Sequence, residues 1–366
     1  MASYERYALK SGETRWRVWW RDPDHRNRNK SGFRTKRDAS DWAARNVTVA
    51  MNDGRYVDPQ GGRVTIGVLG ERWITSHEHV WKPSHAYAIR SSWNAHVFPK
   101  WGNRPVGDVR HSEIQDWVNL LSSERSASVV LRAFGILKGI YDTAVVDGTI
   151  GRSPVLNVQL PKKTRRQRVY LSPEQLHTLA RCSGAYRPLI LVLGLCGLRW
   201  GEATALTVGD VDFETNRLHV VRSVSQVGGK YRLGTPKNGK GRTVPMFQPV
   251  RESLRDVVKG KHKDDLLFPS PSGGYMPPAK RGHGWYGRAL KESGVPSMTC
   301  HDLRHTAASI MVHCGVNVKV LQRILGHSSA VMTLDTYADL FDSDVDVLAA
   351  DVDAAISGVF DAENES

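Results

Sequence analysis

The apolar residues between positions 64 and 159 recur at the spacing of an α-helix. Two sets of apolar side chains each share one helical face: Ile114, Trp117, Val118 and Leu121, and then Val130, Phe134, Leu137, Ile140, Tyr141 and Ala144. Pro83 and Pro154 mark helix boundaries. The sequence therefore predicts an all-α helical bundle of four or five helices over residues 61–160.

A different pattern precedes this bundle. Charged and aromatic residues alternate over part of Arg15–Trp20, which predicts a half-buried strand. A second strand is predicted over residues 31–35, and a helix from Lys36 to about Met51. Residues 53–62 are rich in turn formers and read as a linker. We therefore expect residues 1–60 to form a small β-sheet plus helix domain.

The segment from 170 to 342 mixes both patterns. Ser172 followed by Pro173 predicts the start of a helix, with the serine as its N-cap. Residues 217–224 and 230–235 alternate like two paired strands, and residues 242–246 suggest a third. The rest of the segment is predicted to be mostly helical. Together these patterns predict a multidomain chain whose largest domain is mainly α with a small antiparallel β-sheet.

Two further segments are distinguished by charge. Residues 161–169 form a short basic linker between the predicted bundle and the largest domain. No lysine or arginine follows Arg323, and residues 343–366 form an acidic C-terminal tail whose apolar residues have helical spacing. We hypothesise that this tail helix docks on a neighbouring protomer; the alternative is that it packs on its own domain.

The overall charge favours an anionic polymer as partner. The chain has 366 residues, with 51 Lys and Arg against 37 Asp and Glu, and its net charge is +14. Cationic side chains bind nucleic acids by releasing counterions from the phosphate backbone. The four cysteines form no C-x-x-C pair, which argues against zinc or a disulfide framework. We also predict no membrane segment and a cytoplasmic location, because the N-terminus lacks an apolar signal segment.

Cationic and polar residues suited to phosphate contacts occur in three places. The residues proposed to bind DNA are Arg15, Arg17, Arg26, Arg28 and Lys30 in the first domain, Lys82 and Ser84 in the bundle, and Lys162, Lys163, Arg165 and Arg166 in the linker. Solvated charged surfaces are the alternative for each group. We expect the tryptophans near residues 16–20 to form the core of the first domain rather than to contact bases.

Six residues of the C-terminal half have the chemistry required for phosphoryl transfer: Arg199, Lys237, His301, Arg304, His327 and Tyr337. Arginine donates a planar fork of hydrogen bonds to phosphate oxygens. A tyrosine can be a nucleophile, but its pKa near 10 requires a cationic site or a base. Glu202 lies three residues after Arg199 and can hold its guanidinium. His305 is expected to be structural, and Lys230 or Lys240 could replace Lys237.

These residues stand in five phrases whose order carries a resemblance. The phrases are Gly197–Glu202, Thr235–Asn238, His301–His305, Leu325–His327 and Asp335–Tyr337. In that order they resemble the catalytic domain of tyrosine recombinases, the integrases of temperate phages and integrative elements. The whole chain resembles the larger phage integrases, such as those of mycobacteriophages. The resemblance implies an arm-type DNA-binding domain at 1–60, a SAM-like core-binding domain at 61–160 and a catalytic domain at 170–342.

The resemblance also implies roles and partners. Tyr337 would attack DNA and form a 3′-phosphotyrosyl intermediate, His301 would assist proton transfer, His327 would donate to the phosphate and Lys237 would protonate the leaving 5′-hydroxyl. No cofactor and no metal is implied. The expected partners are double-stranded DNA attachment sites of core and arm type, three further copies in a homotetramer, a directionality factor and a host DNA-bending protein.

Other functions fit parts of the sequence. A Xer-type resolvase or a type IB topoisomerase would share the chemistry, although the first 60 residues argue against the resolvase. A DNA-binding regulator without activity would not require the six residues. A metal-dependent nuclease or transposase would require clustered carboxylates, and no convincing set is present.

Overall fold

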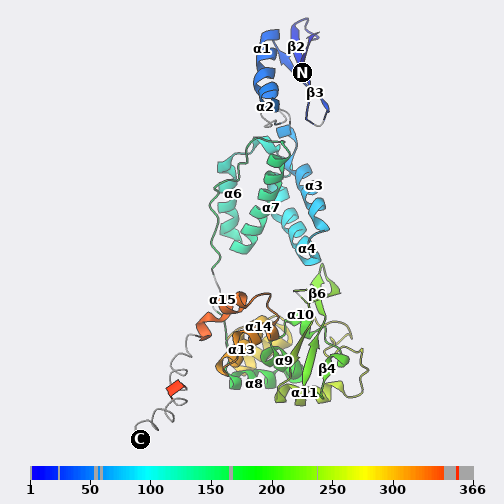
Figure 1. Cartoon of the computed structure of the whole chain (residues 1–366), viewed down its shortest axis with the longest axis vertical. Coiled ribbons are helices and arrows are strands. Elements are labelled where there is room, and N and C mark those ends of the chain that lie inside the picture. The colour runs from blue at the N-terminus through cyan, green and yellow to red at the C-terminus, as the bar shows by residue number, and fades with distance from the viewer. Residues whose placement is uncertain are drawn as a thin grey trace, which may run out of the picture. The chain divides into compact units, whose positions relative to one another are not determined.

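The computed structural model describes residues 2–23, 25–52, 57, 61–164, 168–236, 238–341 and 352–353. It divides into two compact units, residues 1–165 and 166–366 (Figure 1). Lys237, Arg165, Arg166 and nearly all of the acidic tail lie outside the described residues. The chain is multidomain, with many helices and small antiparallel sheets, so the predicted fold class is confirmed.

The N-terminal unit begins with a three-stranded antiparallel sheet in the order β1-β2-β3. Its elements are β1 (Ser3–Ala8), β2 (Thr14–Arg21), β3 (Asn27–Phe33), α1 (Lys36–Ala43) and α2 (Val49–Asn52), the two helices being joined by a π-helical turn at Ala44–Thr48. Val18 and Trp20 of β2 pack with Ala39 and Ala43 of α1 in a small core. The helix therefore covers one face of the sheet, because side chains alternate between the faces of a strand.

Two sequence predictions for this sheet are wrong. The strand placed at residues 31–35 runs from Asn27 to Phe33, and β1 was not predicted. Both strands are mostly polar, and two of the candidate DNA-binding residues, Arg28 and Lys30, lie inside β3. Hydrophobic alternation therefore could not locate either strand.

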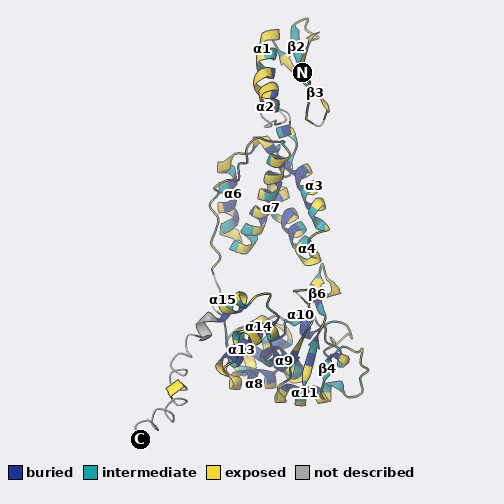
Figure 2. Cartoon of the chain, viewed as in Figure 1, coloured by how far each residue is buried: buried dark blue, intermediate teal, exposed yellow. Residues whose placement is uncertain are grey.

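The second part of this unit is the predicted helical bundle. Its helices are α3 (Ile66–Glu78), α4 (Pro83–Ser92), α5 (Phe98–Trp101), α6 (His111–Glu124) and α7 (Ala127–Val146), with a π-helical turn at Trp93–Val97. The predicted apolar faces of α6 and α7 are buried in one core with Trp93 and Trp101. Figure 2 shows buried and exposed residues along these same helices. None of the described helices combines the length and apolar character needed to cross a bilayer.

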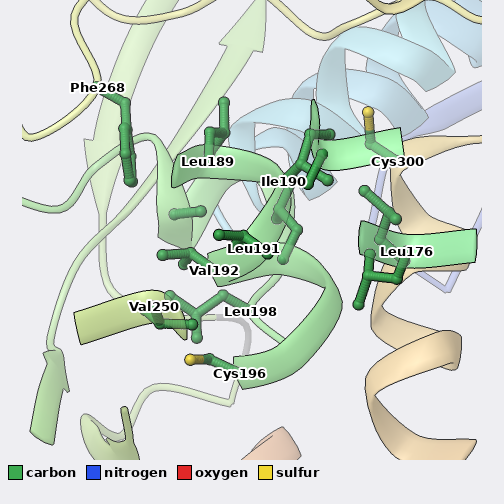
Figure 3. Close-up of a cluster of buried hydrophobic side chains, with 14 of the residues drawn as sticks. Leu176, Leu189, Ile190, Leu191, Val192, Cys196, Leu198, Val250, Phe268 and Cys300 are labelled. Carbon is green, nitrogen blue, oxygen red and sulfur yellow. The ribbon is translucent and has the colours of Figure 1, made fainter. Parts of the chain in front are cut away.

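The core of the C-terminal unit is built around α9 (Arg187–Cys196). Leu189 to Leu193 are all buried, which makes α9 apolar on every side, as expected of a central helix. It packs against α8 (Pro173–Cys182), α11 (Gln248–Val258) and α13 (Cys300–His313), while α12 (Gly284–Ser293) packs on α8. Figure 3 shows the side chains of α9 among Leu176, Val250 and Phe268. The predicted capping of α8 by Ser172 is confirmed.

Two small sheets accompany this core. One has the order β4-β5-β8 and the other is the hairpin β6-β7. The strands are β4 (Val211–Asp212), β5 (Arg217–Val220), β6 (Ser223–Val227), β7 (Lys230–Gly234) and β8 (Arg242–Pro245). The prediction of one strand over 217–224 is wrong. Leu218, Val220 and Val224 keep the same alternation across the break, so periodicity did not reveal that the chain changes sheets.

The last two helices, α14 (Val318–Leu325) and α15 (Ala330–Phe341), pack on α13, and the short helix α10 (Trp200–Ala203) contacts α9 and β6. A second buried cluster joins α13, α14 and α15 and includes Ala307, Leu321, Leu325 and Tyr337. This packing brings residues far apart in the sequence to one place in the C-terminal unit.

Candidate active site

Arg304 lies at the centre of the site and is only 2% exposed. Its Nη1 donates to the carbonyl of Gly197 at 2.7 Å, and its Nη2 donates to the carbonyl of Leu325 at 2.6 Å. Burial, and then the charge of Arg199, lower the pKa of Arg304 to about 9. The guanidinium is therefore still cationic at neutral pH, and the hydrogen bonds that fix it are accepted by neutral carbonyls. A buried cation held in this way is suited to receive an anion.

Arg199 approaches the same region from the N-cap of α10. Its Nη1 donates to Glu202 Oε1 at 2.8 Å and its Nη2 donates to the carbonyl of Gly326 at 3.2 Å. The backbone N–H of Arg199 also donates to Glu202 Oε2, at 2.9 Å. The predicted contact between Glu202 and Arg199 is thus present. The side chain of Arg199 remains 22% exposed, so it can still reach a ligand.

Glu202 has a second cationic partner that the sequence did not predict. Arg242 of β8 donates to both carboxylate oxygens, at 3.1 Å and 2.7 Å, and its Nε donates to the carbonyl of Ile324 at 2.7 Å. Burial alone would raise the pKa of the fully buried Glu202. The hydrogen bonds and charge of Arg242, together with Arg199, instead lower that pKa to about 2. Arg242 therefore connects β8 to α10 through the ionised carboxylate of Glu202, and to α14 through the carbonyl of Ile324.

Gly326 allows this close packing. It ends α14 in the left-handed conformation, with φ of 63°. A Cβ at this position would lie 3.0 Å from Cδ of Arg242. A side chain at residue 326 would therefore be strained and would press on the arginine that holds Glu202.

Tyr337 is buried within the same cluster and is 1% exposed. Its backbone departs from helical geometry inside α15, with φ of −129° and ψ of 17°. Burial raises the pKa of Tyr337 to about 12, although the positive charges of Arg304, Arg168 and Arg199 act in the opposite direction. The guanidinium of Arg168 donates to the carbonyl of Thr336, next to the tyrosine.

The hydroxyl of Tyr337 contacts His305, a residue that the sequence predicted to be only structural. Nδ1 of His305 lies 3.0 Å from Tyr337 Oη. Burial, followed by the charges of His301 and Arg168, lowers the pKa of His305 to about 4, so the ring is neutral at pH 7. His301 is exposed on the same helix, four residues earlier, with its ring centroid 5.1 Å from that of His305. The contact between these two histidines could have been predicted from their i, i+4 spacing on one helix.

His327 lies on another side of the tyrosine. Its ring stacks on that of Tyr337, with centroids 6.3 Å apart and planes 13° apart. Its Nδ1 is 2.9 Å from Thr333 Oγ1, which fixes the ring. Burial, and then the charges of Arg304, Arg199 and Arg242, lower the pKa of His327 to about 4. His327 is therefore a neutral hydrogen-bonding group at pH 7.

The structure thus brings together five of the six predicted residues: Arg199, His301, Arg304, His327 and Tyr337. The sixth, Lys237, lies outside the described residues, between a buried Pro236 and the exposed Asn238. Three arginines around a single carboxylate leave the cluster positively charged. With a phenol beside them, these groups can stabilise a phosphate under attack by an oxygen nucleophile.

The five candidate DNA contacts of residues 15–30 lie on the two faces of the first sheet and in the turn before β3. Arg15 and Arg17 share the face opposite α1, where Arg17 stacks over Tyr7 and Trp19, at 4.9 Å and 5.6 Å from the ring centroids. Trp19 is therefore not a core residue, and the expectation that all these tryptophans pack inside is wrong for it. The indole N–H of Trp19 donates to Glu5 at 2.7 Å.

The other three cations lie elsewhere. Arg28 pairs with Asp22 at 2.9 Å, and Lys30 lies 4.6 Å over the ring of Trp42 in α1. Arg26 is exposed in the turn before β3. These contacts stabilise the turn and the α1 side of the sheet, so of the five candidates Arg15 and Arg17 lie on the open face.

Lys82 and Ser84 are both exposed at the start of α4, where Lys82 is the N-cap. Backbone N–H groups are unpaired in the first turn of a helix and favour anions. Lys162 and Lys163 are also exposed. Arg165 and Arg166 lie outside the described residues.

Comparison with protein families gives two matches. Residues 170–344 match the model of the phage integrase family, and residues 67–159 match that of the phage integrase central domain. Together these matches cover most of the chain.

Individual relatives support the same assignment. The chain is 23% identical over 321 residues to an integrase of Mycobacterium phage D29, covering 82% of this chain and 83% of the relative. It is 29% identical over 274 residues to the transposase of transposon Tn916 from Enterococcus faecalis, covering 67% of each.

Solved structures share the fold. The Tn1549 transposon integrase in complex with transposon right end DNA aligns with a TM-score of 0.67 at 24% identity, over 78% of this chain and all of the other. A lambda integrase tetramer bound to a Holliday junction aligns with a TM-score of 0.59 at 17% identity, over 89% of this chain and 96% of the lambda integrase chain.

Proposed function

Because this chain belongs to the phage integrase family and is a site-specific tyrosine recombinase, we propose that Tyr337 is the nucleophile that cleaves its DNA sites. The Oη–P bond forms at the scissile phosphate while the bond from phosphorus to the 5′-oxygen breaks. The products are a 3′-phosphotyrosyl protein and a free 5′-hydroxyl. Because one phosphodiester replaces another, religation can reverse the step without ATP.

Arg199 and Arg304 bind the non-bridging oxygens, where negative charge increases during the attack. The burial of Arg304 supports this role, because its two hydrogen bonds go to neutral carbonyls and leave its charge available. Loss of one such preorganised donor typically slows a reaction by roughly 10²–10³. His327 donates to the phosphate and His301 assists proton movement. Lys237, or a neighbouring lysine of the same turn, protonates the leaving 5′-oxygen.

The observation that carries this proposal is the position of Tyr337. Its hydroxyl is buried beside a neutral histidine, and the charges of Arg304, Arg168 and Arg199 all act to lower its pKa. A tyrosine that served only for packing would not require this concentration of cations. The same positive charges can neutralise the phosphate, so the proposed cleavage requires no metal ion.

We further propose that each part of the chain contacts a different part of the DNA. Residues 1–60 bind arm-type sites through the open sheet face that carries Arg15 and Arg17. Residues 61–160 bind core-type sites with Lys82 and Ser84 at the start of α4. Residues 161–169 follow the DNA between the bundle and the catalytic domain, residues 170–342.

Four copies would exchange two pairs of strands in turn on one four-way junction, with the tail, residues 343–366, docked on a neighbouring protomer. The lambda integrase tetramer on a Holliday junction has the same fold and provides the precedent for this assembly. The proposed setting is the cytoplasm of a bacterial host, where the protein integrates, and with a directionality factor excises, a phage or integrative element. A host DNA-bending protein would bring the arm and core sites together.

A covalent-trapping experiment tests the nucleophile. The protein is incubated with nicked duplexes that carry candidate attachment sites, and the products are separated on denaturing gels. We expect a protein–DNA adduct that is lost in Tyr337→Phe and retained in Tyr186→Phe, which makes the same chemical change where the ring stacks on Trp285. An adduct that persists in Tyr337→Phe would refute the assignment.

The same assay tests the absence of a metal requirement. We expect the adduct to form at an unchanged rate in excess EDTA, because arginines rather than a metal ion stabilise the phosphate. A restriction enzyme that requires Mg²⁺, present in a parallel tube, confirms that chelation is complete. Loss of the adduct in EDTA and its return on adding Mg²⁺ would contradict metal independence.

A further inference from the structure

Within the part of the chain that the structure describes, Nδ1 of His305 is the hydrogen-bond partner of Tyr337 Oη, at 3.0 Å. The two rings meet at 65°, with centroids 5.6 Å apart, so a ring nitrogen rather than a ring face meets the phenol. Because Tyr337 is 1% exposed, bulk water has almost no access to its side chain. The proton of this hydroxyl therefore needs an acceptor within the protein.

We propose that His305 is the general base of DNA cleavage. The inference rests on the proposed function and adds a residue to it. As Tyr337 Oη bonds to phosphorus, its O–H bond breaks and the proton moves to Nδ1 of His305, which becomes an imidazolium. The bond from phosphorus to the 5′-oxygen breaks, and that oxygen takes a proton from the lysine assigned above. On religation His305 returns its proton to Tyr337.

The other two histidines are less suited to accept this proton. His327 has its Nδ1 on Thr333 Oγ1, at 2.9 Å, and it presents the face of its ring to Tyr337, with the planes 13° apart. His301 is exposed and contacts His305, its ring standing at 83° to it. His301 is therefore placed to exchange a proton between His305 and solvent, while His305 makes the direct contact.

Timing explains how a weak base can suffice. Without DNA, burial raises the pKa of Tyr337 to about 12 and lowers that of His305 to about 4, so the proton stays on the tyrosine. A phenol oxygen loses most of its basicity once it bonds to phosphorus, and the proton then has to leave. General-base catalysis acts at this moment, without free tyrosinate being formed beforehand. A further consequence is that the phenol stays protonated until a phosphate is bound.

Most groups around His305 oppose the positive charge that develops on it. The charged or titratable groups that act on it, in addition to Tyr337, are Arg168, Tyr170, His301, Asp302 and Arg304. His301, Arg168 and Arg304 oppose an imidazolium, whereas Asp302 supports it. A bound phosphate would add negative charge to the same site and offset the arginines. Proton transfer to His305 is therefore linked to occupation of the site by DNA.

The test combines His305→Gln with tyrosine analogues at position 337. Glutamine can still accept a hydrogen bond from Oη but cannot take its proton. On the nicked duplex that gives the wild-type adduct, we expect single-turnover cleavage to slow by roughly 10²-fold or more. Fluorinated tyrosines have a lower phenol pKa and depend less on a base. Incorporated at position 337, they should restore much of the rate to His305→Gln, more so as the pH rises.

Two matched variants separate this role from others. Arg304→Lys in the same assay should not be rescued by the fluorinated tyrosines, because its defect lies in binding the phosphate. His313→Gln changes an exposed histidine at the end of the same helix and should cleave like the wild type. The proposal is overturned if His305→Gln cleaves at the wild-type rate, or if its defect is the same with every phenol at position 337.

A failure of folding would not leave the question open. If His305→Gln does not bind the duplex, the wild-type protein is tested instead, on DNA with a sulfur in place of the 5′-bridging oxygen. This sulfur is a leaving group that needs no acid. A solvent deuterium isotope effect on that cleavage would then report the proton of Tyr337, and its absence would refute a general base. Absence of a wild-type adduct, or persistence of the adduct in Tyr337→Phe, would instead refute the proposed function.

Discussion

Two buried charges in this site are stabilised in opposite ways. Glu202 is fully buried and accepts hydrogen bonds from two arginines, whereas Arg304 is almost as buried and donates to the carbonyls of Gly197 and Leu325. A buried charge without compensation is costly, so each arrangement has a consequence. Glu202 contributes to the structure of the site, and Arg304 keeps its charge available for a ligand.

Removal of Arg242 tests the structural role of Glu202. Arg242→Met leaves the Glu202 carboxylate with one cationic partner in a buried place. We expect the free energy of unfolding of the C-terminal unit to fall by about 3 kcal/mol. Urea unfolding followed by hydrogen exchange in peptides from α9 measures this change. Lys259→Met, which removes an exposed pair with Asp256, is the control and should have little effect.

The depressed pKa of Glu202 predicts a dependence of stability on pH. Its pKa falls from 4.5 to about 2 on folding, so ionised Glu202 contributes about 3 kcal/mol of stability. This contribution is present above pH 4.5 and disappears as the pH falls toward 2. Urea unfolding at pH 7 and at pH 3 should therefore show that the advantage of the wild type over Glu202→Gln shrinks on acidification. A constant difference would contradict the assigned ionisation, and Glu214→Gln, at an exposed position, provides the control.

The residues missed by sequence reasoning are those whose contacts depend on distant elements. The contact between Arg199 and Glu202 follows from a spacing of three residues, and it was predicted. Arg242 lies 40 positions from Glu202, and His305 lies 32 positions from Tyr337. Neither pairing has a local pattern, because each depends on how β8 and α15 pack against the helices around the site.

At the scale of elements, α10 is held against β6 by a residue with no side chain. A Cβ on Gly201 would lie 2.2 Å from the carbonyl oxygen of Val224, and backbone cannot give way as a side chain can. Arg199 and Glu202 flank this glycine. The close approach of the helix to the strand therefore helps to fix both side chains of the site.

Gly201→Ala should consequently separate α10 from β6 and displace Arg199. We expect a folded protein whose rate of adduct formation drops by roughly 10-fold or more, since small displacements of a catalytic group are costly. Gly234→Ala is the matched control, because a Cβ there meets no atom within 4 Å. Equal rates for the two variants would show that the position of α10 does not limit cleavage.

Helices and strands differed in how far they could be predicted. The apolar residues of α6 and α7 recur at helical spacing along one face of each helix, so their pattern alone identified both helices. The strands near the site are two to five residues long. All five residues of β7 are exposed, so this strand has no alternation of buried and exposed positions. Short strands carry too few residues for alternation to determine their ends or partners.

At the scale of the whole molecule, the hydrophobic cores are separate. The cluster around Val18 and Trp20 shares no residue with the cluster of the helical bundle, and neither shares one with the clusters around α9 and α13. Because burial of apolar surface is the main source of stability, segments with separate cores can fold independently. The proposed functions of residues 1–60 and of the rest of the chain can therefore be tested apart.

Deletion of residues 1–60 should leave the adduct-forming reaction on a nicked core duplex intact, because the core of the bundle and the catalytic cluster lose no member. The same deletion should abolish binding to arm-type DNA in mobility-shift assays. In the full chain, Arg17→Gln should weaken arm binding and reduce its dependence on salt, because it removes one cation from the open face. Lys30→Gln, which changes a cation held over Trp42, should have a smaller effect. If Lys30→Gln were the more damaging change, the sheet would meet DNA with its α1 side, and the assignment of the open face would be wrong.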